Sequence, residues 1–444
     1  MERKAQPDWR LLATCSAIAL AIAACSNEAS APPLSEPEPV EAVETVIETV
    51  SFTESGLAAA DARFAQIIAD NDRSGIVAVF ARHGEIAHVS EHGWSNVEAQ
   101  TPMTADTVVR IASMTKPVTA AAILMLIEDG VLSLDTPVST YIPAFADARV
   151  ATSTDINADM EIPTEALTRE ITIEDLLTHT SGMGYVFDYE TRLGALYLGN
   201  NVYEAEDLSV SQRMDVLAGL PLYTQPGEAF YYSWSNDILG YVVAQASDMS
   251  LEAFFQTRIF EPLGMRSTSF YTERLESQDI STGYTHDETG ALVAIEGSSE
   301  QPALMAWETG GAGLFSTAND YFKFAQMLAN GGTYEGRQIL SPESVTALST
   351  AHVGADRMPD EYDAANLGFG YSVAVSYEGN GQSWRRPGDY GWSGFFDTGF
   401  VISPSTGVVG LVMAQEVPGP TTGETVGARA VFDELLYSAL PRES

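Results

Sequence analysis

The chain has 444 residues, of which 22 are Lys or Arg and 61 are Asp or Glu, so its formal net charge is −39. Apolar residues make up 45% and charged residues 19%, which is typical of a globular protein and not of a disordered, collagen-like or coiled-coil chain. The acidic balance argues against a nucleic-acid binder, because phosphate recognition needs a basic face. The length is sufficient for one large domain or for two to three small ones.

The N-terminal segment has the pattern of a targeting signal. Basic residues in the first ten positions precede an uncharged, mostly apolar run over 11–24. This run is short for a membrane span and typical of the apolar region of a signal peptide. It ends in Ile22-Ala23-Ala24-Cys25, which resembles a bacterial lipobox, whose cysteine becomes the lipidated first residue of the mature protein. The alternative is an ordinary small-residue cleavage site with an incidental Cys25.

We therefore expect a signal peptide over 1–24, a tether over 25–56 and one folded domain over 57–440. The tether is predicted because 27–56 holds seven glutamates and four prolines but no basic residue, a composition that favours an extended chain. Ser26 resembles the residue found in lipoproteins sent to the outer membrane. We expect a lipid-anchored protein on the periplasmic side of that membrane, touching it only through Cys25, with secretion as the alternative.

The body of the chain has the elements of an α/β fold. Alternating apolar and polar residues over 75–90 predict a hairpin around Gly84. Apolar spacing and β-rich runs predict further elements: helices over 57–69, 116–129 and 431–440, a mostly helical stretch over 165–290, and strands over 398–402 and 408–414. Strands at both ends around a helical middle indicate an α/β body with an inserted α-helical lobe.

Several common signatures of hydrolases and metal sites are absent from the sequence. It contains no G-x-S-x-G elbow, no H-E-x-x-H and no P-loop. His83, His88 and His92 lie close together, but no carboxylate or cysteine spacing completes a metal site. We expect no metal and no cofactor, and we interpret these residues as exposed strand histidines.

One short pattern points to nucleophilic catalysis. Ser113 and Lys116 lie three residues apart at the start of a predicted helix, so that their side chains share a face. Serine needs a base to act as a nucleophile, and lysine can serve when burial or a helix N-terminus disfavours its charged form. Taken alone, S-x-x-K is common, and an N-capping serine beside a solvated lysine is the simpler interpretation.

The wider segment 110–119 resembles the active-site segment of the serine β-lactamase and penicillin-binding superfamily, especially class C β-lactamases and family VIII carboxylesterases. Other similar segments follow in the expected order: 176–182, 226–233, 262–265, 310–314 and 391–394. The resemblance covers residues 57–438. It implies an α/β fold with a β-lactamase-like antiparallel sheet flanked by helices and an inserted, mostly α-helical lobe.

The resemblance also implies roles for individual residues. Ser113 takes the position of the nucleophile and Lys116 that of the activating lysine. Tyr232 takes the position of the tyrosine that opens the second motif, with Tyr231 as the alternative. The backbone N–H groups of Ser113 and Phe395 would form the oxyanion hole.

Two tryptophans depart from the lactamase pattern. Trp234 stands where lactamases place the asparagine of Y-x-N, and Trp392-Ser393-Gly394 stands in place of K-T-G. The W-x-G form is typical of family VIII esterases. Both changes remove polar groups that hold the amide and carboxylate of a β-lactam, and they leave Trp392, Gly394 and Trp234 as residues of an apolar substrate pocket.

The expected function is that of a serine hydrolase that forms an acyl-enzyme, in particular a carboxylesterase acting on short-chain or small esters. The alternatives are a class C-like β-lactamase or a D-amino-acid-specific peptidase, and a catalytically silent scaffold of the same fold. The expected partner is a small-molecule ester or lactam substrate, without nucleic acid.

Overall fold

The computed structural model describes residues 51–441 except 157–160, 204, 206, 302, 361, 363–364, 378–383 and 420–424. The predicted signal peptide, Cys25 and most of the tether lie outside the described residues, so those predictions stay predictions. The first helix already begins at Glu54, inside the segment predicted as tether. Among the described residues, no helix is both long enough and apolar enough to cross a membrane.

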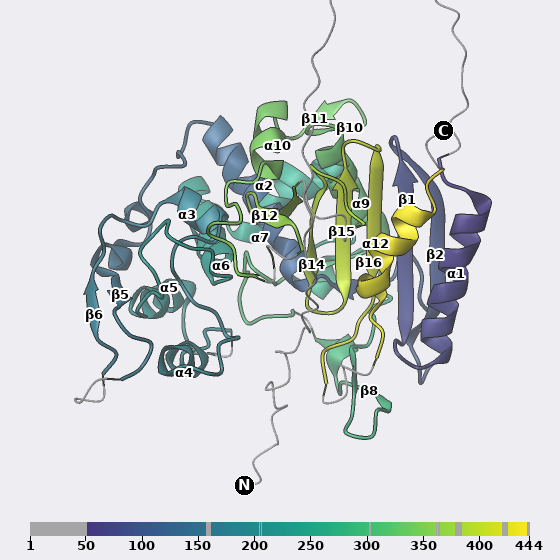
Figure 1. Cartoon of the computed structure of the whole chain (residues 1–444), viewed down its shortest axis with the longest axis horizontal. Coiled ribbons are helices and arrows are strands. Elements are labelled where there is room, and N and C mark those ends of the chain that lie inside the picture. The colour runs from purple at the N-terminus through teal and green to yellow at the C-terminus, as the bar shows by residue number, and fades with distance from the viewer. Residues whose placement is uncertain are drawn as a thin grey trace, which may run out of the picture.

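An eight-stranded antiparallel sheet dominates the part of the chain that the structure describes. Its strands, in spatial order, are β12 Leu367–Phe369, β13 Ala374–Ser376, β14 Tyr390–Gly394, β15 Thr398–Ser403, β16 Val408–Met413, β1 Gly75–Arg82, β2 Glu85–Asn96 and β3 Thr101–Pro102. Strands from the two ends of the chain pair inside this sheet, where β16 lies beside β1 (Figure 1). The predicted hairpin is β1–β2, and the predicted C-terminal strands are β15 and β16.

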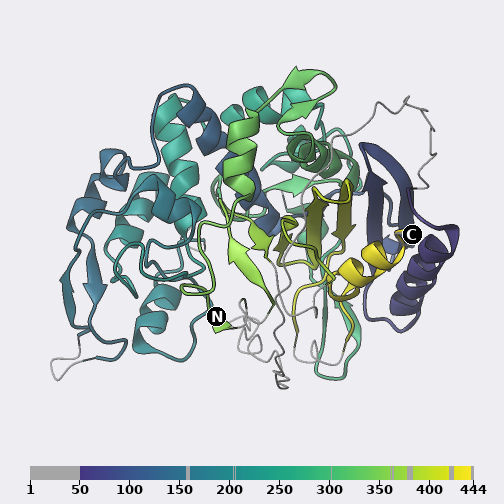
Figure 2. The ribbon, with the colours of Figure 1, turned by 45° about the horizontal axis from the view of Figure 1, so that its top comes forward.

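Helices cover the sheet and build a lobe beside it (Figures 1 and 2). They are α1 Glu54–Ala69, α2 Thr115–Glu128, α3 Ile173–Leu177, α4 Arg192–Gly199, α5 Val210–Ala218, α6 Ser235–Ser247, α7 Leu251–Phe255, α8 Glu261–Leu263, α9 Ala318–Ala329, α10 Pro342–Ser349 and α12 Ala428–Ser438. Two-stranded pairs complete the fold: β4 Val109–Arg110 with β9 Phe315–Ser316, β5 Arg149–Ala151 with β6 Thr164–Ala166, β7 Tyr284–His286 with β8 Leu292–Ala294, and β10 Thr333–Tyr334 with β11 Arg337–Gln338. The predicted α/β body with an inserted helical lobe is confirmed.

Both faces of the sheet are buried, and β1 shows why. Successive side chains of a strand point to opposite faces. Ile76 and Phe80 belong to the cluster that packs with α1 and α12, whereas Val77 and Val79 belong to the main core on the other face. Helices α1 and α12 contact one another over the first face, and α9 contacts the opposite side of β1 and β16. The sheet is therefore the middle layer of a three-layer body.

Helix α2 connects this body to the helical lobe. Every residue from Thr115 to Leu126 is buried, so the helix is enclosed on all sides and not along one stripe. It packs against α6, α7 and α10. The sequence correctly predicts this helix. Because α2 is surrounded by protein, its N-terminus is fixed at the junction of the body and the lobe.

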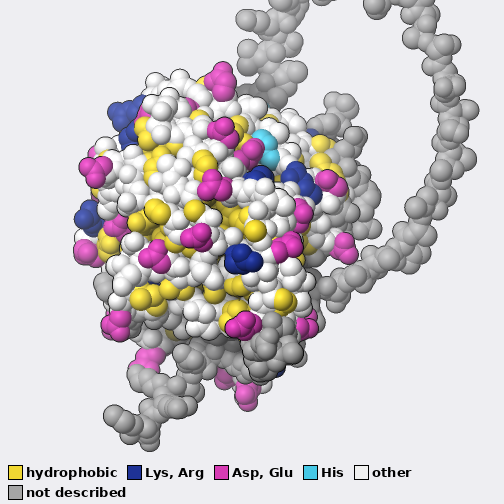
Figure 3. Space-filling model, turned by 90° about the vertical axis from the view of Figure 1, so that its left-hand side faces the viewer, with side chains coloured by type: hydrophobic (Ala, Val, Ile, Leu, Met, Phe, Trp, Pro, Cys, Tyr) yellow, Lys and Arg dark blue, Asp and Glu magenta, His cyan; other side chains and the backbone are white. Residues whose placement is uncertain are grey.

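The surface of the helical lobe keeps the acidic character of the sequence. Figure 3 shows this face, with acidic side chains spread across it and few basic ones. A field of one sign repels anionic molecules at long range, and salt screens it.

Candidate active site

Ser113 lies in a tight turn immediately before α2. The turn is a single 3-10 stretch, Ala112–Met114. Ala112 has a φ of 43°, in the left-handed region that a residue with a Cβ rarely adopts. Hydrogen bonds to Leu314 hold both sides of the turn: Ile111 N–H donates to the Leu314 carbonyl over 3.1 Å, and Leu314 N–H donates to Thr115 Oγ1 over 3.2 Å. Such a strained, well-held turn is a common device for presenting a functional side chain.

Lys116 is fully buried one turn further on. Its Nζ donates to Ser113 Oγ over 3.1 Å and to the carbonyl oxygen of Gly311 over 2.7 Å. The ammonium position lies 4.7 Å from the ring centre of Tyr232 and 5.6 Å from that of Tyr185. The serine hydroxyl, one backbone carbonyl and two aromatic rings therefore surround the amine and hold it against Ser113 Oγ.

Tyr232 completes the group of three. Its hydroxyl donates to Ser113 Oγ over 2.7 Å. The ring is supported by His179, with ring centres 4.9 Å apart, and by Trp392 at 5.6 Å. Tyr231, the alternative from the sequence, instead stacks on Tyr223 at 5.0 Å. The structure therefore brings Tyr232, and not Tyr231, to the serine.

His179 supports the tyrosine and does not act as a base. It is fully buried, and its Nδ1 lies 2.9 Å from Ser233 Oγ. Burial, together with the nearby charge of Lys116, holds the pKa of His179 well below its usual value. The ring is therefore neutral at physiological pH, and it contacts the face of Tyr232 without reaching Ser113 Oγ through any hydrogen bond in the described structure.

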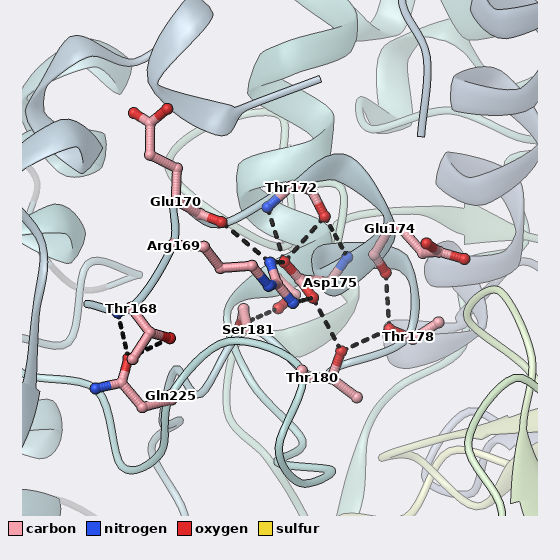
Figure 4. A network of polar contacts seen from close by, with 12 residues as sticks. Thr168, Arg169, Glu170, Thr172, Glu174, Asp175, Thr178, Thr180, Ser181 and Gln225 are labelled. Atoms are coloured by element: carbon pink, nitrogen blue, oxygen red, sulfur yellow. Dashed lines mark hydrogen bonds and ion pairs between the residues drawn. The ribbon is translucent and has the colours of Figure 1, made fainter. Parts of the chain in front are cut away.

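A polar network holds the loop that carries His179 (Figure 4). Asp175, in the first turn of α3, accepts two hydrogen bonds from Arg169 over 2.5 and 2.8 Å, and Thr172 completes a capping box at the same helix. Thr180 N–H donates back to the Asp175 carbonyl over 2.8 Å, and the His179 carbonyl accepts from Tyr231 N–H over 2.8 Å. This network ties the segment 176–182 to the segment 226–233, which brings Tyr232 into register with Ser113.

A buried carboxylate lies behind the lysine and was not expected from the sequence. Asp237, in the first turn of α6, is fully buried and accepts a hydrogen bond from the Tyr203 hydroxyl over 3.0 Å. Burial raises the pKa of Asp237 to about 6, against the opposing effect of the Lys116 charge. A Cβ on Gly311 would collide with Asp237 Oδ2. The double glycine 310–311 therefore permits close packing between Asp237 and the carbonyl that binds Lys116.

Ser113 and Tyr232 open into a cleft of about 830 Å³, and Lys116 is buried beside them. Trp392, Gly394 and Phe395 line it with Ser113, as expected for pocket residues. A Cβ on Gly394 would collide with the carbonyl of Ile111, so the end of β14 lies directly against the chain that leads to the serine. The close approach explains how a residue of the sheet comes to share a cleft with a residue at the start of α2.

Trp234 has a different position from the one that its sequence motif suggested. It is fully buried and does not line the cleft. Its ring packs against Tyr203 at 4.4 Å and Tyr185 at 4.9 Å. Tyr185 contacts both Trp234 and Tyr232. Trp234 therefore supports the site through its neighbours and does not contact the substrate cleft.

The histidines of β2 form a surface cluster. His88 Nε2 lies 2.9 Å from Asp61 Oδ1 and His92 Nε2 lies 3.6 Å from the same atom. Among the described residues, no group of three or more His, Cys, Asp or Glu side chains is arranged to hold a metal ion.

Comparisons with known proteins agree with this geometry. The profile of the family described as Beta-lactamase matches residues 60–432. Esterase EstB of Burkholderia gladioli is 30% identical over 396 residues, which cover 82% of this chain and 92% of that protein. Protein Rv1367c of Mycobacterium tuberculosis is 33% identical over 365 residues, which cover 78% of this chain and 86% of that protein. The solved structure of EstCE1, described as a hydrolase with promiscuous acyltransferase activity, has a TM-score of 0.70 at 26% identity and covers 86% of this chain and 99% of that chain.

The family match extends from α1 into α12 and so includes the sheet, the lobe and the cleft. The resemblance seen in the sequence is confirmed, and with it the class of enzyme that the resemblance implies. The chain is a serine hydrolase that belongs to the beta-lactamase family.

Proposed function

We propose that the protein is a carboxylesterase that cleaves small, short-chain esters through an acyl-enzyme on Ser113. The observation that carries this proposal is the pair of hydrogen bonds at Ser113 Oγ, from Lys116 Nζ over 3.1 Å and from Tyr232 Oη over 2.7 Å. Esterase EstB and lovastatin esterase of Penicillium rubens are among the relatives of this chain. These names support ester chemistry for the same site.

In the first half of the reaction Ser113 Oγ attacks the ester carbonyl, and its proton passes to Lys116 and Tyr232. The negative charge that develops on the carbonyl oxygen is stabilised by the N–H groups of Ser113 and Phe395, each of which contributes about 3 kcal/mol. The carbon–oxygen bond to the alcohol then breaks, and Tyr232 returns the proton to the leaving oxygen. An acyl-enzyme and a free alcohol result.

In the second half, water replaces the alcohol. Tyr232 and Lys116 accept a proton from the water as it attacks the acyl carbonyl, and that proton passes to Ser113 Oγ when the ester bond to the enzyme breaks. The acid product leaves and the site returns to its starting state.

Ester specificity is proposed because the position of the lactamase K-T-G lysine is Trp392, which lines the cleft and carries no charge. A charged or polar substrate group left without its partner costs about 1–3 kcal/mol. The loss of this one charged partner lowers kcat/KM for lactams by about one to two orders of magnitude.

The test measures kcat/KM for p-nitrophenyl acetate and for a chromogenic cephalosporin on the same preparation. We expect a ratio well above one for the wild type, and no hydrolysis of either compound by Ser113→Ala. Turnover of the ester by Ser113→Ala at the wild-type rate would remove Ser113 from its role. A ratio at or below one would favour the β-lactamase alternative. Trp392→Lys should lower the ratio if this position sets the preference.

We also propose that the mature protein is held by lipid on Cys25 at the periplasmic side of the outer membrane. The support is the Ile22-Ala23-Ala24-Cys25 pattern, followed by Ser26 and an acidic, proline-rich segment. Mass spectrometry of the protein from membranes should find a lipid-modified N-terminal cysteine. A mature chain that begins at another residue contradicts the proposal, as does an unchanged product from Cys25→Ser.

A further inference from the structure

A second hollow, with a volume of about 290 Å³, adjoins the active-site cleft. We call it the aromatic annex, and it is defined by Tyr185, Phe187, Asp188, Tyr223, Tyr231 and Tyr232. Phe187 and Tyr232 line both the annex and the cleft that contains Ser113. A substrate bound at the serine can therefore extend one of its groups past these two rings into the annex.

Two rings of the annex are left in water although they are large and apolar. Phe187 is 43% exposed and Tyr231 is 37% exposed. Both are held in place by neighbouring rings. Tyr231 stacks on Tyr223 with 5.0 Å between ring centres and an interplanar angle of 22°, and Phe187 meets Tyr185 edge-on at 5.0 Å and 78°. A rigid group of exposed apolar side chains is typical of a surface that binds a ligand.

The polar groups of the annex leave no charge free for a ligand. Asp188 accepts hydrogen bonds from the hydroxyls of Thr191 and Tyr223 and from the backbone N–H groups of Glu190 and Thr191. Partial burial acts against ionisation, but these hydrogen bonds hold the pKa of Asp188 below its usual value. Among the described residues that line the annex, Asp188 is the one charged group, and its carboxylate already accepts these four hydrogen bonds. The annex therefore excludes ligands that carry a carboxylate and accepts neutral ones.

Aromatic walls favour an aromatic guest. Ring pairs gain additional stabilisation from offset-stacked and edge-to-face contacts, which a saturated ring of similar size does not make. In another protein a cavity of about 150 Å³ is sufficient for benzene. The space in the annex is therefore ample for one substituted ring.

The position of Tyr232 indicates which part of the ester enters the annex. In the proposed mechanism its hydroxyl, 2.7 Å from Ser113 Oγ, returns the proton to the leaving alcohol. The ring of the same residue is a wall of the annex. The group bonded to the leaving oxygen is therefore the group nearest to the annex.

We propose that the aromatic annex is a subsite for a neutral aromatic ring on the alcohol side of the ester. The preferred substrates are then arylmethyl and related aryl esters of short acids. This proposal rests on the proposed esterase function and specifies its substrate class.

The test compares benzyl acetate with cyclohexylmethyl acetate, because the two alcohols are similar in size and in leaving ability and differ in aromaticity. Ethyl acetate serves as the substrate without a ring. We expect wild-type kcat/KM to be about tenfold higher for benzyl than for cyclohexylmethyl acetate. Tyr231→Ala should remove most of this preference. Tyr231→Phe, which keeps the ring, should retain it.

Trp384→Ala is the matched control. Trp384 is 51% exposed but lines neither the annex nor the cleft, so its removal should change none of the three rates. Phe187→Ala provides a second variant in case Tyr231→Ala folds poorly, and near-wild-type circular dichroism should accompany each measurement. Loss of the benzyl preference in either annex variant, with the control unchanged, supports the proposal.

Equal wild-type rates for benzyl and cyclohexylmethyl acetate overturn the proposal, as does a benzyl preference that survives in both Tyr231→Ala and Phe187→Ala. A preference seen only between methyl benzoate and methyl cyclohexanecarboxylate also overturns it, because the ring is then on the acyl side. These results leave ester hydrolysis intact. Failure of the wild type to hydrolyse any of the esters faster than Ser113→Ala contradicts the proposed function itself.

Discussion

Lys116 and Asp237 are linked through a single residue, Gly311. The carbonyl of Gly311 accepts a hydrogen bond from Lys116 Nζ over 2.7 Å, and the same residue packs so closely against the Asp237 carboxylate that no Cβ fits between them. The charge of Lys116 in turn favours ionisation of Asp237. The lysine that activates the serine is therefore placed and electrostatically influenced by a carboxylate that does not touch the substrate.

Asp237→Asn should change the pH dependence of the enzyme. Burial raises the pKa of Asp237 to about 6, so the wild-type carboxyl gains its charge around that pH, whereas the amide keeps the shape without the charge. The change in kcat/KM that follows this ionisation should therefore be missing from the profile of Asp237→Asn. The measurement is a pH profile from 5 to 9 with p-nitrophenyl acetate.

The matched control for this prediction is Asp248→Asn, an exposed aspartate at the C-terminal end of the same helix. It should leave the profile unchanged. A slower Asp237→Asn enzyme with the wild-type profile would show that Asp237 acts only through packing.

Gly311→Ala should lower kcat by more than tenfold with little effect on KM. The added Cβ collides with Asp237 Oδ2, so the backbone must move and the carbonyl that binds Lys116 moves with it. A misplacement of about 1 Å can cost about a hundredfold in rate. Gly199→Ala is the control, because a Cβ there meets no atom within 4 Å. Wild-type kcat in Gly311→Ala would contradict the positioning role of this loop.

Lys116→Arg should retain less than a tenth of the wild-type rate. Arginine stays protonated in proteins and cannot accept the proton of Ser113. Lys323→Arg is the control: Lys323 donates to the Gly264 carbonyl and pairs with Asp320, and arginine preserves that charge. If Lys116→Arg keeps more than about a tenth of kcat, corresponding to about 1.4 kcal/mol of barrier, lysine is not the general base.

Glu416→Gln should stabilise the protein at high pH. Burial raises the pKa of Glu416 to about 7, although Arg73 lowers it. Because the folded state binds this proton more tightly than the unfolded chain, the contribution of Glu416 to stability falls as pH rises from about 4.5 through 7. Glutamine has no such dependence.

The measurement for this prediction is the difference in Tm between variant and wild type, which should become more positive between pH 5 and pH 8.5. Glu276→Gln, at an exposed surface ion pair, should show a difference that is small at both pH values. A difference for Glu416→Gln that is constant across pH would contradict the role of its ionisation.

Local patterns in the sequence predict much of this architecture. The alternation around Gly84 predicts the β1–β2 hairpin, and the spacing of Ser113 and Lys116 predicts a contact that helix geometry alone produces. The structure places Tyr232 beside the serine. In the sequence, only the resemblance to a known family pointed to this residue. Residues 119 positions apart meet there, and spacing gives no information on such contacts.

The features that the sequence did not reveal depend on packing between distant segments. Asp237 carries no signal in its own motif, because its importance comes from Gly311, which lies on a different segment. In the sequence the double glycine is only part of the segment 310–314 that resembles the family, and its close approach to α6 is visible only in three dimensions. The annex likewise depends on Phe187 and Tyr231, which belong to two loops.

The meeting of the first and last described elements has a consequence for engineering. Thr53 N–H donates to the Ala439 carbonyl over 2.8 Å, so the two ends of the folded domain are adjacent, and a few glycine and serine residues could join them. The chain could then be reopened at the exposed turn at Gly290, where a Cβ would meet no atom within 4 Å. Such a circular permutant would keep Ser113, Lys116 and Tyr232 on one uninterrupted segment. Its new chain ends, and therefore any fused carrier, would lie at the β7–β8 hairpin instead of at α1.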